Sequence, residues 1–508
     1  MSATTPVPDK TLTLAVRPSE RVARLLSRRI SQRLSSFPAV MLVLLVGNVF
    51  YLCRDRITDP DLWWHLRNAQ FLLTNHKFPN VDTFSGTAAG SLWINFEWLS
   101  EVLYYAAFNA LGLRGIYFLS ASALALLVAA VFLLCVKEAK DPFTAVVATF
   151  CGTLLATVGF GPRSQHFGWL CFMGIYAIML RYRSTRRGPL WLLPVIFAIW
   201  INCHGTWLFG LAVYSIFVGA GLIKRDIGRL AAHPWSATDL KRLIATGLAS
   251  GAALFLNPFG YRLVLYPFDM MFRQKLGVAN VEEWASVNFN DGRGVLVAMA
   301  LAAVFAIVLV GRKRWRIDDA LLTGFVLYCG LSHMRFLLLA GIVLPPIITS
   351  HLGIISSYDP RRERRLLNSF LLAGVAGACI LGFPSEKRLN GDQSNYFPVK
   401  AAAFLRANPQ AGNIFNVYGW GGYLEWNLPH IKTFIDSRND IFEYNGTLKD
   451  YLDITWLVKS EELLTKRRVS YILYTRDSPL AYFLSKDVYW KELYHDERAV
   501  IYRRVQPL

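Results

Sequence analysis

"TDPDLWWHLRNAQFLLTNHKFP", residues 58–79, directly follows the first strongly apolar segment of the chain, residues 37–53. The stretch begins with two closely spaced aspartates and also holds two histidines, an arginine and two tryptophans, and tryptophan is typical of the water–lipid boundary. Its apolar residues recur at helical spacing: Leu62, Leu66, Ala69 and Leu73. The stretch therefore predicts an amphipathic helix that lies at a membrane surface and carries charged groups.

The composition indicates a polytopic α-helical membrane protein. The 508 residues are 54% hydrophobic and 18% charged, whereas soluble domains are about a quarter charged. Only helices satisfy their own backbone groups in lipid at the lengths of the apolar stretches. We expect about eleven crossings: 37–53, 114–136, 143–160, 167–182, 189–203, 206–223, 241–257, 294–311, 318–331, 334–352 and 366–383.

The positive charge follows the pattern of a topology signal. The net charge is +19, and Lys and Arg cluster in short runs between apolar stretches, which argues against a nucleic-acid partner. A basic arm, residues 1–36, precedes the first span and predicts a cytoplasmic N-terminus in the cytoplasmic (inner) membrane. Four basic runs then fall on the same side: 181–187, 223–229, 311–316 and 359–365. This topology places the first loop, residues 54–96, on the outer face.

Two segments do not fit a simple count of spans. Residues 97–112, "EWLSEVLYYAAFNALG", are apolar, but a full crossing there would move the basic run at 181–187 to the outside. We therefore expect a short, incomplete or re-entrant helix. Residues 258–272 are expected along the interface. The seven cysteines all lie in or beside apolar stretches, so neither a disulfide framework nor a Cys-type zinc site is expected.

After the multi-span region, residues 37–383, the character of the chain changes. Residues 384–508 contain short β-rich runs bounded by Gly, Pro and Asn, with helical stretches between them. This pattern predicts a small extracytoplasmic α/β domain. Within "FIDSRND", Asp436 and Arg438 follow an expected strand, and a strand-end turn with a local ion pair is the favoured interpretation.

The opening stretch holds the first candidate residues. Pro60 suits the first position of a helix and Asp59 its N-cap. Asp61 and His65 are four residues apart and share a helix face. A carboxylate beside an imidazole can act as a general base or bind a divalent cation, and a solvated ion pair is the alternative. The metal requirement stays open at this point.

Other ionisable residues recur at the outer ends of the spans. Such groups are costly at membrane depth and usually face a cavity or a partner, although each one alone could simply end a helix in the headgroup zone. Their shared face would suit a polyprenyl-phosphate substrate, because Arg and His bind phosphate and an acid can activate an acceptor. The candidate substrate-binding residues are His65, Arg163, His166, His204, Glu282, Glu283 and Arg335.

With these motifs the chain resembles the GT-C superfamily of membrane glycosyltransferases, which includes protein O-mannosyltransferases and the aminoarabinose transferase of lipid A. The resemblance rests on a cytoplasmic N-terminus, an acidic first outer loop, many spans and a small outer C-terminal domain. It implies that Asp59 or Asp61 is the catalytic acid, although "DPD" departs from the more usual Asp-Glu. It also places Arg163 near the lipid phosphate.

The sequence thus predicts an integral-membrane glycosyltransferase that moves a sugar from a polyprenyl-phosphate donor to a lipid, glycan or protein acceptor on the outer face. A divalent cation is the one cofactor that the acidic loop admits. Two alternatives remain at this point. One is a transporter or flippase of a lipid-linked saccharide, and the other is a non-catalytic assembly protein derived from the GT-C fold.

Overall fold

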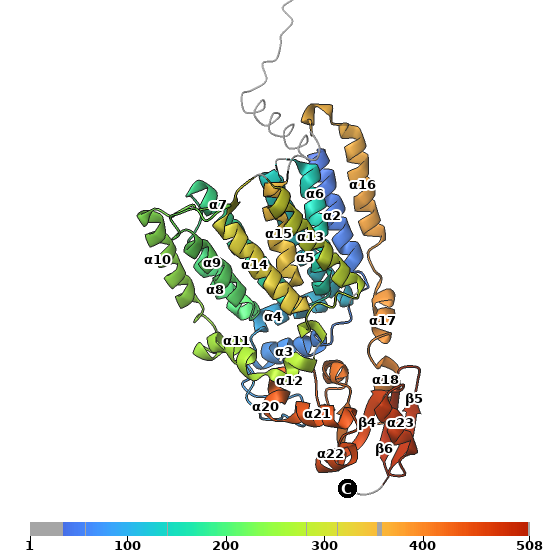
Figure 1. The fold of residues 1–508 in the computed structure, drawn as a ribbon. Helices are drawn as coiled ribbons and strands as arrows, with labels where there is room; N and C mark the ends of the chain where they lie inside the picture. The colour runs from blue at the N-terminus through green and yellow to red at the C-terminus, as the bar shows by residue number, and fades with distance from the viewer. Residues whose placement is uncertain are drawn as a thin grey trace, which may run out of the picture.

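The computed structural model describes residues 34–55, 57–139, 141–280, 282–311, 313–352 and 358–505, so most of the basic arm lies outside it. Long helices run side by side above a smaller C-terminal domain (Figure 1). The bundle contains α2 (Phe37–Cys53), α5 (Leu113–Ala139), α6 (Pro142–Ala156), α7 (Gln165–Thr185), α8 (Leu192–Cys203), α9 (Trp207–Ala220), α10 (Ala237–Ala253), α13 (Gly292–Val310), α14 (Ile317–Ser332), α15 (Leu337–His351) and α16 (Arg365–Leu381).

Each predicted span overlaps one of these helices, but length and composition qualify fewer of them as crossings. In the described residues, four helical segments are long and apolar enough: Leu113–Ala139, Pro142–Gly159, Gly292–Val310 and Met334–His351. A fifth is added if α16 and α17 (Glu386–Ser394), which meet at a bend of 59°, form one span. The expected number of about eleven crossings remains a prediction.

Helices α6 and α15 pack closely because glycines face each other. A Cβ atom on Gly152 would lie 2.6 Å from the carbonyl oxygen of Gly341, and one on Gly341 would lie 2.4 Å from that of Gly152. Small residues let membrane helices approach in this way, so that backbone and side-chain contacts replace the hydrophobic effect that lipid does not supply. This contact holds α15 in place, and the turn that carries Arg335 directly precedes this helix.

Two of the basic runs meet at one end of the bundle. Arg314 forms an ion pair with Asp226 at 2.7 Å. Beside this pair, β1 (Leu230–Ala231) and β2 (Trp315–Arg316) form a short parallel pairing. Loops that were expected on the same membrane side therefore contact each other, which supports the alternation predicted from charge.

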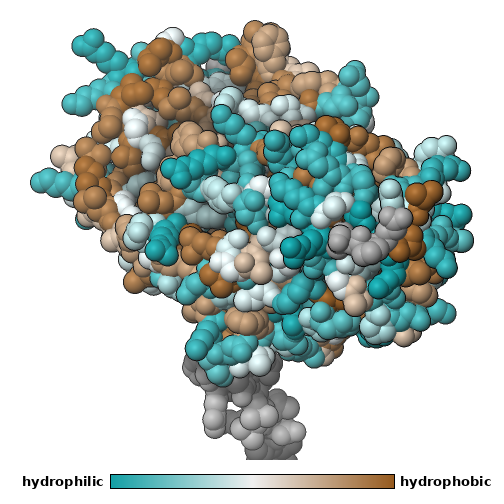
Figure 2. All heavy atoms as spheres, turned by 90° about the horizontal axis from the view of Figure 1, so that it is seen from below, coloured by the Kyte–Doolittle hydropathy of each residue, from teal (hydrophilic) through white to brown (hydrophobic). Residues whose placement is uncertain are grey.

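The opposite end carries short helices that lie across the bundle (Figure 1). They are α3 (Asp61–Asn75), α4 (Trp98–Leu111), α11 (Tyr261–Arg273) and α12 (Lys275–Asn280). With 14 residues, α4 is about 21 Å long, less than the roughly 30 Å of a bilayer core. This length agrees with the expectation of an incomplete helix. Seen from this end, hydrophilic residues gather over much of the surface, and hydrophobic residues are prominent toward one side (Figure 2).

Helix α3 begins one residue later than the sequence indicated. Pro60 is the N-cap residue, in a helical conformation, and Asp61 is the first residue of the helix. The Asp59 carboxylate still accepts a hydrogen bond from the Asp61 N–H at 2.9 Å, and so satisfies one of the backbone donors left free at a helix start. Asp59 thus caps the helix start as predicted in kind, but from the position before the N-cap residue.

The C-terminal domain is built on a four-stranded sheet in the order β3-β4-β6-β5. Strands β3 and β4 are parallel, and β6 is antiparallel to both β4 and β5. The strands are β3 (Asn413–Asn416), β4 (Val469–Thr475), β5 (Trp490–His495) and β6 (Ala499–Arg504). The helices are α18 (Val399–Ala407), α19 (Gly421–Asn427), α20 (Asn439–Tyr444), α21 (Thr447–Thr455), α22 (Ser460–Lys466) and α23 (Pro479–Lys486).

Three details of this domain differ from the sequence prediction. The strand expected before Asp436 is not formed, and Thr433 makes only an isolated bridge with Ser85. The run that follows β3 turns into α19, which packs on α3 of the first loop, rather than continuing as a strand. Strand β5 was not expected, because its sequence "WKELYH" has no apolar alternation and its side chains are mostly exposed. Pairing with β6 holds it in the sheet, and local pattern does not report such pairing.

Candidate active site

Three predicted residues from distant segments meet at the lower end of the bundle. The Arg163 Nε atom lies 2.9 Å from Asp59 Oδ2. The Arg163 Nη1 atom donates to Glu283 Oε2 at 2.6 Å, and Nη2 donates to the other oxygen of the same carboxylate. The loop after α2, the turn before α7 and the 3₁₀ turn η2 (Glu282–Trp284) supply the three side chains. We call Asp59, Arg163 and Glu283 the Arg163 cluster.

The charges of the Arg163 cluster are set by burial and by the shared guanidinium. Burial raises the pKa of Asp59 to about 6, against the opposing effect of Arg163. Burial also disfavours the charge of Glu283, but its hydrogen bonds with Arg163 prevail and lower its pKa. Glu283 therefore stays ionised at neutral pH. The pKa of Asp59 lies closer to neutral pH, where a general base works best.

Arg335, in the 3₁₀ turn η3 (Met334–Phe336), supplies a cation without an acidic partner. Its guanidinium carbon lies 4.5 Å from the ring centroid of Trp284, the residue next to Glu283. Its Nε atom is buried and has no hydrogen-bond partner. No carboxylate of the described residues lies within 4.0 Å of its nitrogens, since no ion pair involves it. A cation held by a ring face beside the Arg163 cluster is available to bind an anion.

A second group of ionisable residues surrounds His65. His65 Nδ1 lies 2.9 Å from Glu101 Oε1, and its Nε2 lies 3.8 Å from Glu97. The other oxygen of Glu97 lies 3.1 Å from His204 Nε2. Asn95 donates to Glu101 at 2.7 Å. The structure thus joins two predicted residues, His65 and His204, through a glutamate that the sequence analysis did not single out.

The protonation states in this second group differ sharply. Burial opposes the charge on His65, but the hydrogen bond to Glu101 and the charge of Glu97 raise its pKa to about 9. Burial raises the pKa of Glu97 to about 7. Burial lowers the pKa of His204 well below its usual value. A charged His65, a titrating Glu97 and a neutral His204 therefore form a line of groups that could hold and pass a proton.

A sequence signal for the missed glutamates existed. Glu97 and Glu101 are four residues apart in an otherwise apolar stretch, so they share a helix face where an acid is costly. The stretch had been judged only for whether it crosses the membrane. Both acids are buried, at 6% and 0% exposure, because their partners come from α3 and from the segment after α8.

The remaining predicted residues have other side-chain partners, although the backbone N–H of Asp61 donates to Asp59 of the Arg163 cluster. Asp61 Oδ1 accepts hydrogen bonds from Trp64 Nε1, at 3.2 Å, and from the Ser437 hydroxyl of the C-terminal domain. His166 lies in α7, where its ring nitrogens contact the Tyr104 hydroxyl at 3.3 Å and a backbone carbonyl at 2.9 Å. The side chain of Glu282 lies outside the described part of the structure. Among the described residues, Asp61 therefore faces the small domain and His166 faces the core.

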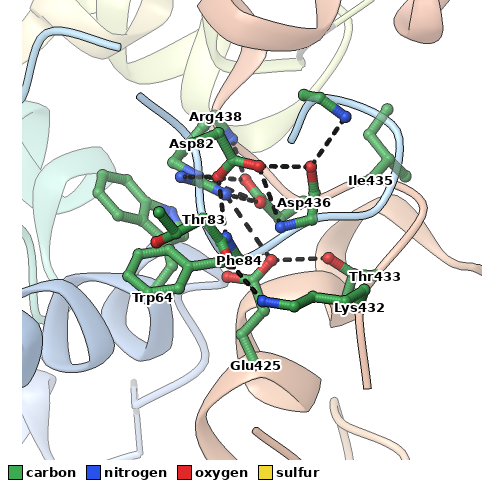
Figure 3. Close-up of polar contacts among 12 residues, drawn as sticks. Trp64, Asp82, Thr83, Phe84, Glu425, Lys432, Thr433, Ile435, Asp436 and Arg438 are labelled. Atoms are coloured by element: carbon green, nitrogen blue, oxygen red, sulfur yellow. Dashed lines mark hydrogen bonds and ion pairs between the residues drawn. The ribbon is translucent and has the colours of Figure 1, made fainter. Parts of the chain in front are cut away.

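Asp436 and Arg438 belong to a sealed cluster that joins the small domain to the first loop (Figure 3). Arg438 contacts Asp82 of the first loop at 2.8 Å and Asp436 at 2.5 Å, with Glu425 at 3.7 Å. All four side chains are at most 1% exposed. The local ion pair between Asp436 and Arg438 that the sequence predicted is present. Arg438 also forms a second, long-range ion pair with Asp82. We call these four residues the Arg438 cluster.

The arrangement of donors does not form a cation site. In the described ranges, no three His, Cys, Asp or Glu side chains gather as a metal would require. The oxygens of Asp59 face the guanidinium of Arg163 and the N–H of Asp61 instead. The divalent cation remains a prediction from the sequence.

The fold, in which a multi-helix bundle carries a small domain at one end, is shared by solved structures of the oligosaccharyltransferase AglB from Archaeoglobus fulgidus. The complex with an inhibitory peptide and a dolichol-phosphate matches with a TM-score of 0.53 at 11% identity, over 85% of this chain and 69% of that one. The form tethered to an acceptor peptide with the NVT sequon matches with a TM-score of 0.52 at 13% identity, over 92% and 74%.

A third structure of that enzyme, in complex with Zn and sulfate, matches with a TM-score of 0.51 at 14% identity, over 91% and 73% of the two chains. No protein-family model and no curated protein matches the sequence. The likeness supports the GT-C resemblance at the level of the fold. It does not single out the bacterial subfamilies to which the sequence motifs were compared.

Proposed function

We propose that the chain is an integral-membrane glycosyltransferase that transfers a sugar from a polyprenyl-phosphate donor to an acceptor at the outer face of the cytoplasmic membrane. The observation that carries this proposal is the pairing of a titratable acid, Asp59, with two cations, Arg163 and Arg335, at one end of the bundle. Glycosyl transfer from a lipid phosphate needs an acid–base group beside an anion site. The AglB structure with dolichol-phosphate has the same fold.

The donor phosphate would bind at Arg335 and Arg163. Among the described residues, the Nε atom of Arg335 has no hydrogen-bond partner. Arg163 binds Glu283 through two parallel hydrogen bonds, which is the geometry that a phosphate also uses. We therefore assign Glu283 the role of a placeholder that leaves Arg163 when the phosphate arrives. Its side chain is 33% exposed and comes from a single 3₁₀ turn, so little structure opposes the exchange.

Asp59 is the better base of the two aspartates. It touches Arg163, and burial places its pKa at about 6, so it is ionised at neutral pH and can still accept a proton. Asp61 instead receives hydrogen bonds from Trp64 and Ser437 and so helps to anchor the small domain. In the proposed reaction, Asp59 takes the proton of the acceptor hydroxyl and the acceptor oxygen bonds to the anomeric carbon. The bond from that carbon to the phosphate oxygen breaks, and Arg163 and Arg335 hold the negative charge of the departing phosphate.

The group of ionisable residues around His65 would support this chemistry without touching the substrate. His65 is charged and lies within 3.8 Å of Glu97, which in turn contacts His204. A buried positive charge on His65 stabilises the carboxylates of Glu97 and Glu101. The small domain, which packs on α3 through α19, would cover the acceptor side.

The direct test uses the purified full-length protein with radiolabelled polyprenyl-phosphate sugars and a membrane extract as the source of acceptors. We expect Asp59→Asn to lower the rate of transfer by about 10²- to 10⁴-fold, the usual contribution of a general base. Asp61→Asn should reduce it less, and Ser437→Ala should reproduce that smaller loss because it removes the same anchor. Full activity of Asp59→Asn at equal expression would refute the assignment, and absence of transfer by the wild type from every donor would refute the proposed function.

A further inference from the structure

The basic end of the bundle, away from the candidate active site, carries a cavity of about 610 Å³. Lys137 of α5 and Arg181, Thr185 and Arg187 at the end of α7 line it. Helix α7 begins near Arg163 and ends at Thr185, so the length of the bundle separates the cavity from the Arg163 cluster. The proposed transfer reaction makes no use of this cavity.

The cations of the basic run divide into compensated and uncompensated ones. Arg183 forms ion pairs with Asp318 and Asp319, at 2.8 and 2.5 Å. Arg186 stacks on Trp235, with its guanidinium carbon 4.3 Å from the ring centroid. In the described ranges, three cavity residues have side chains with neither an ion pair nor a hydrogen bond: Lys137, Arg181 and Arg187. The acids of the bundle neutralise the inward-facing cations and leave those of the cavity free.

An exposed apolar face of α5 leads to the same cavity. Leu126 and Leu133 are 62% and 59% exposed. They lie seven residues apart and Lys137 follows four residues later, so the three share one face of the helix. This face has hydrocarbon-like residues along its length and a cation at its end. A lipid with an anionic headgroup would fit this face, with its headgroup at Lys137 and its acyl chains along the apolar residues.

We propose that the cavity binds the phosphate headgroup of an anionic phospholipid from the membrane leaflet at the basic end. The phosphodiester would lie among Lys137, Arg181 and Arg187, and the acyl chains would follow the exposed face of α5. Basic pockets between membrane helices on the cytoplasmic side recognise lipid headgroups in this way. The lipid would hold α5 and α7 together at the end where the bundle has no covering domain.

The test measures the melting temperature of the full-length protein in neutral detergent against the concentration of a short-chain phosphatidylglycerol. Parallel titrations use the phosphatidylcholine of equal chain length and inorganic phosphate. We expect stabilisation by phosphatidylglycerol alone. The variant Lys137→Gln/Arg187→Gln should bind it roughly thirty-fold more weakly, from about 1 kcal/mol per cation at a lipid surface.

A matched control removes the same charges at the same end. Lys224 and Arg225 are exposed and lie in another basic run, so Lys224→Gln/Arg225→Gln should leave the titration unchanged. Equal weakening by the control would show a diffuse charge effect and overturn the proposed site. Equal stabilisation by inorganic phosphate would overturn the lipid as its ligand. Both variants change exposed side chains, and their melting temperatures without lipid report whether each remains folded.

Discussion

Two arginines of this chain are each surrounded by carboxylates, but only one cluster is open. Arg438 is 1% exposed, and Asp82, Asp436 and Glu425 around it are equally buried. Arg163 is 20% exposed, and its partner Glu283 is 33% exposed. The same residue types thus form a buried ion-pair cluster around Arg438 and a partly exposed ion pair at Arg163.

The difference comes from what surrounds each guanidinium. Arg438 lies 4.7 Å from the ring centroid of Trp93 and 5.4 Å from that of Phe84, so aromatic rings cover its guanidinium. Burial raises the pKa of Glu425 well above its usual value, which reduces the negative charge that Arg438 has to offset. At Arg163, in contrast, one carboxylate comes from a single exposed turn, and a free cation lies beside it. Accessibility therefore separates the buried Arg438 cluster from the Arg163 cluster, to which we assign the reaction.

The largest effect on stability should come from Arg438→Met. This change leaves two buried carboxylates without their cation, and removal of one partner of a buried pair costs about 3–5 kcal/mol. We expect a much lower midpoint of thermal unfolding. Lys449→Met, an exposed change in the same domain, serves as the control. Equal midpoints for the two variants would show that the Arg438 cluster contributes no net stability.

Arg335→Leu tests the open cluster through activity. A charge-assisted hydrogen bond is worth about 1.5–3 kcal/mol, so kcat/KM for the lipid-phosphate donor should fall roughly 10- to 100-fold. The unfolding midpoint should change little, since Arg335 has no acidic partner to orphan among the described residues. A large loss of stability with unchanged kcat/KM would reverse the roles that we assign to the two clusters.

Glu283→Gln should act in the opposite direction. Loss of the carboxylate weakens the bidentate contact with Arg163, so the donor phosphate meets less competition and its KM should fall by about tenfold. The measurement is initial rate against donor concentration, with Glu462→Gln, an exposed change, as the control. A raised KM would mean that Glu283 binds the substrate rather than holding its place.

The smallest effect concerns pH and His65. The folded-state pKa of His65 is about 9, above its ordinary value of 6.5, so its charge stabilises the fold fully below 6.5 and this contribution is lost as pH rises through 9. Glu97 is ionised above its pKa of about 7, which leaves His65 as the titrating member of the group between pH 7 and 9. The unfolding midpoint should decline across that interval in the wild type, and His65→Asn should flatten the decline. An identical slope in both proteins would contradict the raised pKa.

Much of the architecture could be read from local pattern. The apolar stretches overlap bundle helices because hydrophobic length directly reports what lipid can hold. The basic runs meet at one end, as charge alternation predicts. The start of α3 was placed within one residue, because a Pro after an Asp is a strong local signal. The number of crossings is not determined in this way, since several bundle helices are shorter than a bilayer.

The sequence alone predicted a membrane bundle with an acidic first loop and a small terminal domain, because hydropathy and charge are local properties. It placed Asp59, Arg163 and Arg335 on one face without stating which atoms meet. Only the tertiary structure decided that Arg163 lies between Asp59 and Glu283, residues 224 positions apart, and that Arg438 binds Asp82 across 356 positions. Such contacts depend on how helices and domains pack, and no local periodicity records that packing. For the same reason, our proposal of Asp59 as the base depends on a tertiary contact, the hydrogen bond between Asp61 and Ser437 of the small domain.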